Sequence, residues 1–400
     1  MPLRKSASPK GPVFAFFADP VMEHTLATEQ ATYNAQKLAD SGAYSSADAL
    51  NAALQKSVRD GRSVPDQAPE TPLEAAQLLI YKTPHTKAPD ERRRLAEEAL
   101  ALSADCADGH RILAEYEQEP DQKRRRLADA IAAGRRIFEA SGLDADPGER
   151  WRYIEIRPML RAMATLGMHL RAQGDLDDAV TVFSDMIDIN PKDNQGVRFV
   201  LAPLLLALGD IKGFQKLDAA FGEEPSAEWA YSRALLAFRE AGPASRQALK
   251  ELRLGLSRNR EIPRFLGGVR SIPDQLPIAF IPGGDDEAVL YVDRAGALWR
   301  DTPGALDWLS ETTVAGSTAS DEIEDDDDAY DESLAFRPPR YGFPTLWRWV
   351  SLRPPAEGPT QGRDSKLSRK ERQLENELLI RIRGMKSLDR LAAMVDRLRT

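Results

Sequence analysis

A segment of 34 residues, 160–193, constrains the fold of this chain more than any other part of its 400 residues. Its apolar residues recur at three- and four-residue spacing on both sides of Gly174, as they do in two amphipathic helices joined by a turn. Gly167 has no side chain and lets the second helix pack closely, where Ala179 and Phe183 form a small and large pair at the contact. The segment therefore predicts an antiparallel helical hairpin.

The hairpin pattern returns at a regular interval. Pro191 ends the second helix, and Pro225 follows 34 residues later as another helix stop. Gly209 stands one residue late for the intervening turn, and Trp229 lies near the start of a further unit. Residues 91–116 read as the second helix of one unit and the first helix of the next. At least three such units are needed to bury a continuous core, and the chain has that many.

The order of Leu-Gly, Ala, Phe and Pro in this unit resembles the tetratricopeptide repeat. Residues 99–115, 155–161, 190–198 and 284–309 resemble a group of uncharacterised bacterial tetratricopeptide proteins and, more distantly, the repeat region of the eukaryotic suppression of tumorigenicity seven family. The resemblance implies a helical repeat domain over 73–310 and supplies no catalytic residues. The eukaryotic family is membrane-associated, but this chain lacks its hydrophobic spans, so that property does not carry over.

Proline content and charge divide the chain into segments. Three prolines fall within residues 62–72, which favours a linker, and residues 311–335 hold ten acids without Lys or Arg, which favours disorder. Residues 288–292 could form a strand or a buried helix turn. We expect an all-α chain, a tetratricopeptide-type helical-hairpin solenoid with flanking disordered tails and a C-terminal helical segment. Its expected parts are a disordered tail (1–26), a helical N-terminal extension (27–60), a linker (61–72), the solenoid (73–310), an acidic disordered linker (311–335), a Pro- and aromatic-rich segment (336–363) and C-terminal helices (364–400).

Composition argues against several kinds of site and partner. One cysteine cannot form an intramolecular disulfide or a multi-cysteine zinc site, and the four histidines lack metal-ligand spacing. The net charge of −9 argues against nucleic acid as the main partner. The apolar run at 13–18 is too short for a signal-peptide core, and no run is long enough to span a bilayer. We therefore expect a cytoplasmic protein without a metal or cofactor.

The concave groove of a helical-repeat array is lined by the first helix of each unit, and we expect it to bind the partner. Arginines there could hold an acidic peptide or a C-terminal carboxylate by bidentate bonds. The alternatives are solvated arginines that pair with Glu155, and a helix cap made by Asp193 or Asn194. The candidate groove residues are Arg157, Arg161, Met168, Arg171, Asn194, Gln195 and Arg198.

Other conspicuous residues have simpler interpretations. The basic runs 92–94 and 123–126 lie beside acids and favour exposed, ion-paired helix faces over phosphate contacts. Cys106 has no neighbouring base in the sequence, which favours a structural thiol, and His169 fits a hydrogen-bonded helix histidine. The acids of 283–287 fit the N-terminus of a helix.

These observations predict a non-catalytic protein–protein interaction scaffold that binds a peptide or a partner helix in its groove. One alternative is an assembly subunit that pairs through its C-terminal helix, and the other is an enzyme with an unrecognised site. The acidic linker could fold back on the basic C-terminal end or on the groove. The sequence does not identify the partner or the oligomeric state.

Overall fold

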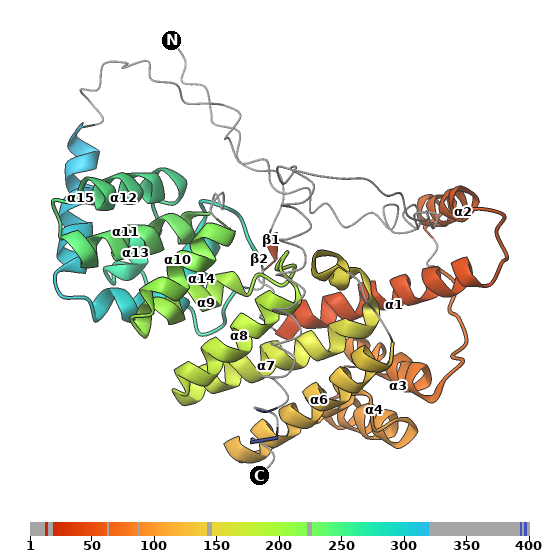
Figure 1. The fold of residues 1–400 in the computed structure, drawn as a ribbon. Coiled ribbons are helices and arrows are strands. Elements are labelled where there is room, and N and C mark those ends of the chain that lie inside the picture. The colour runs from red at the N-terminus through yellow and green to blue at the C-terminus, as the bar shows by residue number, and fades with distance from the viewer. Residues whose placement is uncertain are drawn as a thin grey trace, which may run out of the picture. The chain divides into compact units, whose positions relative to one another are not determined.

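The computed structural model describes residues 13–14, 19–61, 64–86, 88–141, 146–221, 226–277 and 279–319, together with residues 393, 396 and 397. Over this part of the chain the secondary structure is helical apart from one pair of two-residue strands (Figure 1). The all-α prediction is therefore confirmed at this level. The expected Pro- and aromatic-rich segment, nearly all of the C-terminal helices and most of the acidic linker lie outside the described residues.

The chain divides into two compact units, and each is described by itself. The first comprises Met22–Gln195 with Gly342–Thr400, and the second comprises Met1–Val21 with Gly196–Tyr341. The helices of the first are α1 (Asp19–Asp40), α2 (Ala47–Arg59), α3 (Pro72–Ile80), α4 (Pro89–Leu102), α5 (Ala107–Ala114), α6 (Pro120–Ala140), α7 (Arg157–Gln173) and α8 (Leu176–Ile189), with 3₁₀ turns at Thr83–His85, Pro147–Arg152 and Ile154–Ile156.

Successive helices of the first unit pack as pairs, α3 with α4, α5 with α6 and α7 with α8, and α5 also packs on both α3 and α7. The pair α7 and α8 is the hairpin that the sequence predicts. Gly174 ends α7 with a left-handed φ of 86°, and a Cβ at Gly167 would lie 2.6 Å from the Phe183 ring. Ala179 and Phe183 are fully buried, and α8 ends two residues before Pro191.

The N-terminal helical extension begins earlier than the sequence predicts. Helix α1 starts at Asp19 instead of residue 27, because Pro20 falls in its first turn, where a proline needs no hydrogen-bond partner for its nitrogen. Helix α1 ends at Asp40, and Gly42 follows it with a left-handed φ of 69°. The expected tail of 1–26 therefore contains the first turns of a helix.

The second unit contains α9 (Arg198–Ala207), α10 (Ile211–Ala220), α11 (Ala227–Ala241), α12 (Arg246–Arg258), α13 (Ile262–Leu266), α14 (Asp285–Arg300) and α15 (Ala305–Ala319). Strand β1 (Val13–Phe14) pairs antiparallel with β2 (Ala279–Phe280), and Val13 lies opposite Phe280.

Residues 288–292 belong to α14, so they form a buried helix segment. The predicted acidic linker begins inside α15, because residues 311–319 hold a single acid and the other nine acids follow residue 320.

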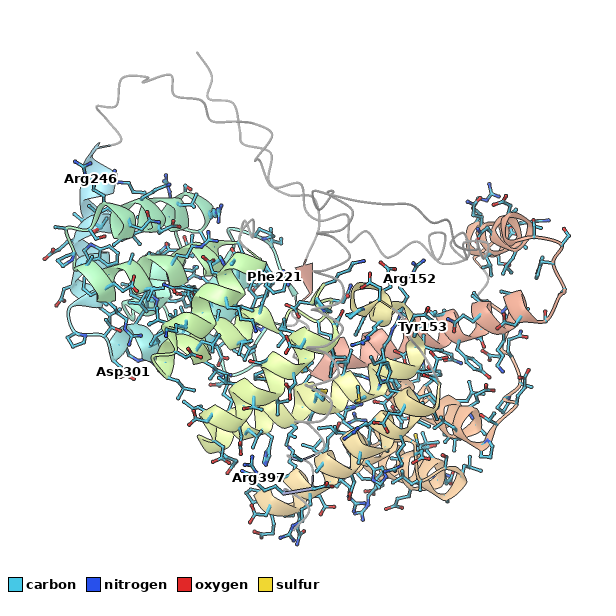
Figure 2. All side chains as sticks on the ribbon, viewed as in Figure 1. Arg152, Tyr153, Phe221, Arg246, Asp301 and Arg397 are labelled. Atoms are coloured by element: carbon cyan, nitrogen blue, oxygen red, sulfur yellow. The ribbon has the colours of Figure 1, made fainter. Side chains whose placement is uncertain are left out.

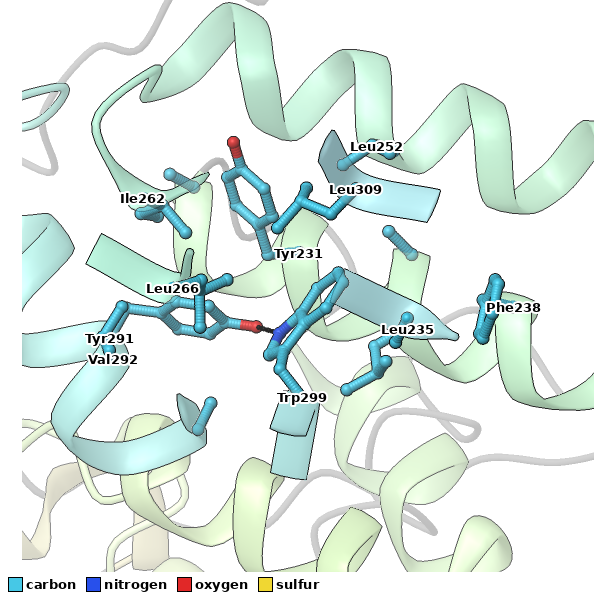
Figure 3. Close-up of a cluster of buried hydrophobic side chains, with 14 of the residues drawn as sticks. Tyr231, Leu235, Phe238, Leu252, Ile262, Leu266, Tyr291, Val292, Trp299 and Leu309 are labelled. Atoms are coloured by element: carbon cyan, nitrogen blue, oxygen red, sulfur yellow. Dashed lines mark hydrogen bonds between the residues drawn. The ribbon is translucent and has the colours of Figure 1, made fainter. Parts of the chain in front are cut away.

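Aromatic side chains fill the core of the second unit (Figure 3). The Trp299 indole donates to the Tyr291 hydroxyl over 2.8 Å and lies parallel to the Trp308 ring, with 6.4 Å between ring centroids. The Tyr231 hydroxyl donates to the Asn259 carbonyl over 2.9 Å. These bonds satisfy the polar ends of large rings that would otherwise be costly to bury.

Candidate functional site

The structure brings two of the predicted groove residues, Arg157 and Arg161, into one buried cluster on α7. Met168 and Arg171 are half-buried farther along the same helix. Asn194 and Gln195 lie in the turn that follows α8, with Gln195 buried. The remaining candidate, Arg198, opens α9 in the second unit, and its guanidinium lies 4.3 Å and 5.2 Å from the ring centroids of Phe199 and Phe221.

Asp108 on α5 holds one edge of the Arg161 guanidinium. Arg161 Nε donates to Asp108 Oδ1 over 2.9 Å, and Nη2 donates to Oδ2 over 2.5 Å. Asp108 also accepts from Arg111 Nε over 3.1 Å and from Gln77 Nε2 over 3.1 Å. Burial alone would raise the pKa of Asp108, but the two guanidinium groups hold that pKa well below its usual range. Asp108 is therefore an ionised carboxylate at the centre of a buried network.

Glu29 of α1 takes the other edge of the same guanidinium. Arg161 Nη1 donates to Glu29 Oε2 over 2.8 Å, and Nη2 donates to Oε1 over 3.0 Å. The Tyr81 hydroxyl donates to Oε1 over 3.2 Å, and Arg157 Nη1 lies 3.8 Å from Oε2. Glu29 is only 1% exposed and Arg161 only 2% exposed. We call Glu29, Tyr81, Asp108, Arg157 and Arg161 the Arg161 cluster.

Apolar and polar contacts hold α1 on either side of Glu29. Leu26 and Tyr33 belong to a buried hydrophobic cluster with Ile80 and Ile112, from α3 and α5. Leu26, Glu29 and Tyr33 are spaced by three and four residues, so they share one face of α1. Beyond them, Lys37 pairs with Glu74 over 2.9 Å. Helix α1 thus shares a buried apolar cluster with α3 and α5 and bonds Arg161 of α7, and these three are the first helices of their pairs.

This arrangement differs from the interpretation of Arg161 as a solvated arginine. Arg161 is not a solvated arginine that pairs with Glu155, because it is buried between Glu29 and Asp108. In this structure its ligand is a residue of the same chain, 132 positions away in the sequence. The sequence reasoning did not identify Glu29. The available signal is the spacing of Leu26, Glu29 and Tyr33 by three and four residues, which places them on one face of a helix.

Residues 193 and 194 do not occupy the cap position of α9. The residue that precedes the helix is Val197, whose own side chain makes no capping hydrogen bond. Asp193 instead adopts a left-handed φ of 46° in the turn, and its N–H donates to the Asn190 carbonyl over 2.9 Å. At α14 the predicted role of the acids is confirmed, since Glu287 Oε2 accepts from the Gly283 N–H over 2.7 Å at the helix start.

The basic runs form ion pairs on helix faces, as expected. Arg93 pairs with Glu97 over 2.9 Å and Arg94 with Glu98 over 2.5 Å along α4, and Arg126 of α6 pairs with Glu117, which precedes that helix. Near the C-terminus, Arg397, which is labelled in Figure 2, donates to Asp178 of α8, and the bond length is 2.9 Å. In these pairs the arginines already contact carboxylates, and the same guanidinium groups are the ones that could otherwise contact phosphates.

Cys106 and His169 have local structural surroundings. Burial raises the pKa of the Cys106 thiol to about 12, so little thiolate is present near neutral pH. His169 Nε2 lies 3.1 Å from the Pro120 carbonyl, and burial lowers the pKa of this histidine. Both observations agree with the structural roles expected from the sequence.

Within the described residues, no three His, Cys, Asp or Glu side chains are grouped in a way that could hold a metal ion. None of the helices described here is long and apolar enough to cross a membrane. Comparison of the chain with protein-family models, with curated proteins and with solved structures gives no match.

Proposed function

We propose that this protein is a non-catalytic interaction scaffold of the tetratricopeptide type, and that the face formed by α3, α5 and α7 binds a helix of a protein partner. The observation that carries the proposal is the docking of α1. A helix lies on this face through one of its sides, and an arginine of the face receives a glutamate of that helix over 2.8 Å and 3.0 Å. Insertion of an amphipathic helix into a groove is a recurrent mode of peptide recognition.

The repeat assignment rests on the close packing of the hairpins. Gly167 allows the Phe183 ring to approach α7, and Gly255 on α12 does the same for the Tyr231 ring, which a Cβ would meet at 2.9 Å. Gly174 and Gly209 both adopt left-handed φ angles at the turns of successive pairs. These positions support the hairpin unit inferred from the sequence.

The test uses a variant of the full chain in which the contacts that hold helix α1 are weakened. Leu26→Ala and Tyr33→Ala remove two apolar anchors of α1 and leave α3, α5 and α7 unaltered. We call this variant the opened chain. A fluorescent peptide of residues 19–40 is titrated with it, and binding is followed by fluorescence anisotropy. A scrambled peptide of the same composition is the control.

We expect the opened chain to bind the peptide saturably and the scrambled peptide not to bind. Circular dichroism and thermal unfolding show whether the opened chain is folded. A folded opened chain that binds neither peptide would contradict the proposed function.

A further inference from the structure

We infer that the members of the Arg161 cluster outside α1 form a receptor for one glutamate side chain on a partner helix, and that α1 competes with that partner from within the chain. The partner is then an amphipathic helix with an apolar residue, a glutamate and an aromatic residue at positions i, i+3 and i+7, as Leu26, Glu29 and Tyr33 are arranged in α1. This inference rests on the proposed function and adds the chemistry of the partner and its regulation.

The receptor is built by residues outside α1. Asp108 binds the Nε and Nη2 edge of Arg161, and Gln77 and Arg111 hold Asp108 in turn. This leaves the Nη1 and Nη2 edge directed at the position of the Glu29 carboxylate. Because a guanidinium fork fixed in this way loses little freedom when a ligand binds, the geometry favours a bidentate carboxylate. Asp108 is thus a positioning residue for Arg161.

The positive charges of the buried arginines require a second carboxylate besides Asp108. Arg161 is fully enclosed, and the carboxylate that fixes it is shared with Arg111. Arg157 places a further cation 3.8 Å from Glu29 Oε2. A buried guanidinium is costly unless its charge is balanced and its donors are used. Glu29 supplies that balance, and a partner that displaced α1 would have to supply it too.

The donors match the two oxygens of one carboxylate. One oxygen of Glu29 accepts from Arg161 Nη2 and from the Tyr81 hydroxyl, and the other accepts from Arg161 Nη1 with Arg157 beside it. The site is almost closed to solvent when occupied, since Glu29 is 1% exposed. A glutamate side chain reaches it from a helix whose apolar residues belong to one buried cluster with Ile80 and Ile112.

Competition by α1 follows from its connection to the same unit. A helix tethered close to its own site is present at an effective concentration in the millimolar range, so a free helix must overcome this advantage. Residues of the connection also hold α1, because Asn34 Nδ2 donates to Asp66 over 3.1 Å and the Gln67 N–H donates to Asn34 Oδ1 over 3.1 Å. Weakening the α1 anchors should therefore increase binding of the free helix.

The experiment compares three fluorescent peptides of residues 19–40, the natural one, one with Glu29→Gln and one with Asp40→Asn. Glutamine has the shape of glutamate without its charge, and Asp40 is an exposed acid at the end of the same helix. Each peptide is titrated with the wild-type chain, the opened chain and the opened chain that also carries Arg161→Lys.

We expect the Glu29→Gln peptide to bind the opened chain about 10- to 100-fold more weakly than the natural peptide, because a bond to a charged group is lost. The Asp40→Asn peptide should bind within about twofold of the natural one. Arg161→Lys should weaken the natural peptide and leave the Glu29→Gln peptide nearly unchanged, since lysine lacks the planar fork. The wild-type chain should bind the natural peptide at least tenfold more weakly than the opened chain.

Three results would overturn parts of the inference separately. Equal binding of the natural and Glu29→Gln peptides would refute the glutamate receptor and leave helix binding intact. Equal binding by the wild-type and opened chains would refute competition by α1. If no peptide binds a folded opened chain, the proposed function fails as well. Should the opened chain not fold, the full chain with Glu29→Gln alone replaces it, because it keeps Leu26 and Tyr33.

Discussion

Replacing Glu29 by glutamine in the full chain should loosen α1 and leave the rest of its unit intact. The substitution preserves the size of the side chain, so it creates no cavity. In the natural chain, two nitrogens of Arg161 donate to the Glu29 oxygens over 2.8 Å and 3.0 Å. The substitution replaces one of these oxygens with an NH₂ group, which cannot accept a hydrogen bond from Arg161. At least one hydrogen bond to a charged group is lost.

The expected magnitude follows from that loss. A hydrogen bond to a charged group contributes about 1.5–3 kcal/mol, so the free energy that keeps α1 docked should fall by ~2 kcal/mol. This corresponds to a roughly 30-fold increase in the population of the undocked helix, since each 1.4 kcal/mol is a factor of ten. The Leu26 and Tyr33 contacts remain and should keep most molecules docked.

Amide hydrogen exchange measures this population helix by helix. Peptic fragments that cover residues 26–37 should exchange about 30-fold faster in the Glu29→Gln chain. Fragments from α11 and α12, in the other unit, serve as an internal reference. Asp40→Asn is the matched charge control and should change exchange in α1 by less than about twofold.

Two results would refute this reasoning in different ways. Unchanged exchange in α1 would mean that the Glu29 carboxylate does not hold the helix. Equal acceleration in α1, α5 and α7 would mean that α1 opens only when the whole unit unfolds, so that α1 is part of the core and not a separable ligand.

Three further predictions concern the fold. Gly167→Ala should lower the free energy of unfolding in urea by about 1–2 kcal/mol, because overpacking against Phe183 outweighs the gain in helix propensity. Adding Phe183→Leu to this variant should recover part of the lost stability, because the smaller side chain leaves room for the new methyl group. Asp108→Asn should lower the Tm at pH 7 and narrow the Tm difference between pH 7 and pH 3. The depressed pKa of Asp108 means that its carboxylate stabilises the fold above the unfolded pKa of about 3.9 and loses this effect as the pH falls. Tyr291→Phe should cost roughly 1–3 kcal/mol, because the buried Trp299 N–H loses its acceptor; a Tm equal to that of the wild type would contradict this.

The sequence predicts local features of this fold better than long-range ones. The hairpin of α7 and α8 is encoded by short-range spacing, with Gly167 and Gly174 at positions where a side chain would clash or strain the backbone. The start of α1 is predicted less well, since the helix begins at Asp19 with Pro20 in its first turn, where a proline is tolerated.

The candidate site shows more clearly what cannot be predicted from the sequence. The repeat pattern predicts Arg161 and Arg171 of α7 as candidates, because they fall on its groove-facing positions. It does not predict the partners of Arg161, since Glu29 and Asp108 are 132 and 53 residues away from it. Periodicity describes which face of a helix is buried and does not specify which distant residue meets it. Nothing short of the tertiary arrangement connects these three residues.

The separation between Glu29 and Arg161 also has a consequence for synthesis of the chain. At 5–20 residues per second, the 132 residues between them take roughly 7 to 26 seconds to translate. During that interval α1 has left the ribosome before its arginine exists, and Leu26, Glu29 and Tyr33 have no completed surface to bind. A nascent chain therefore passes through a period in which this helix is accessible to chaperones or to another polypeptide, and the period ends only when α7 emerges.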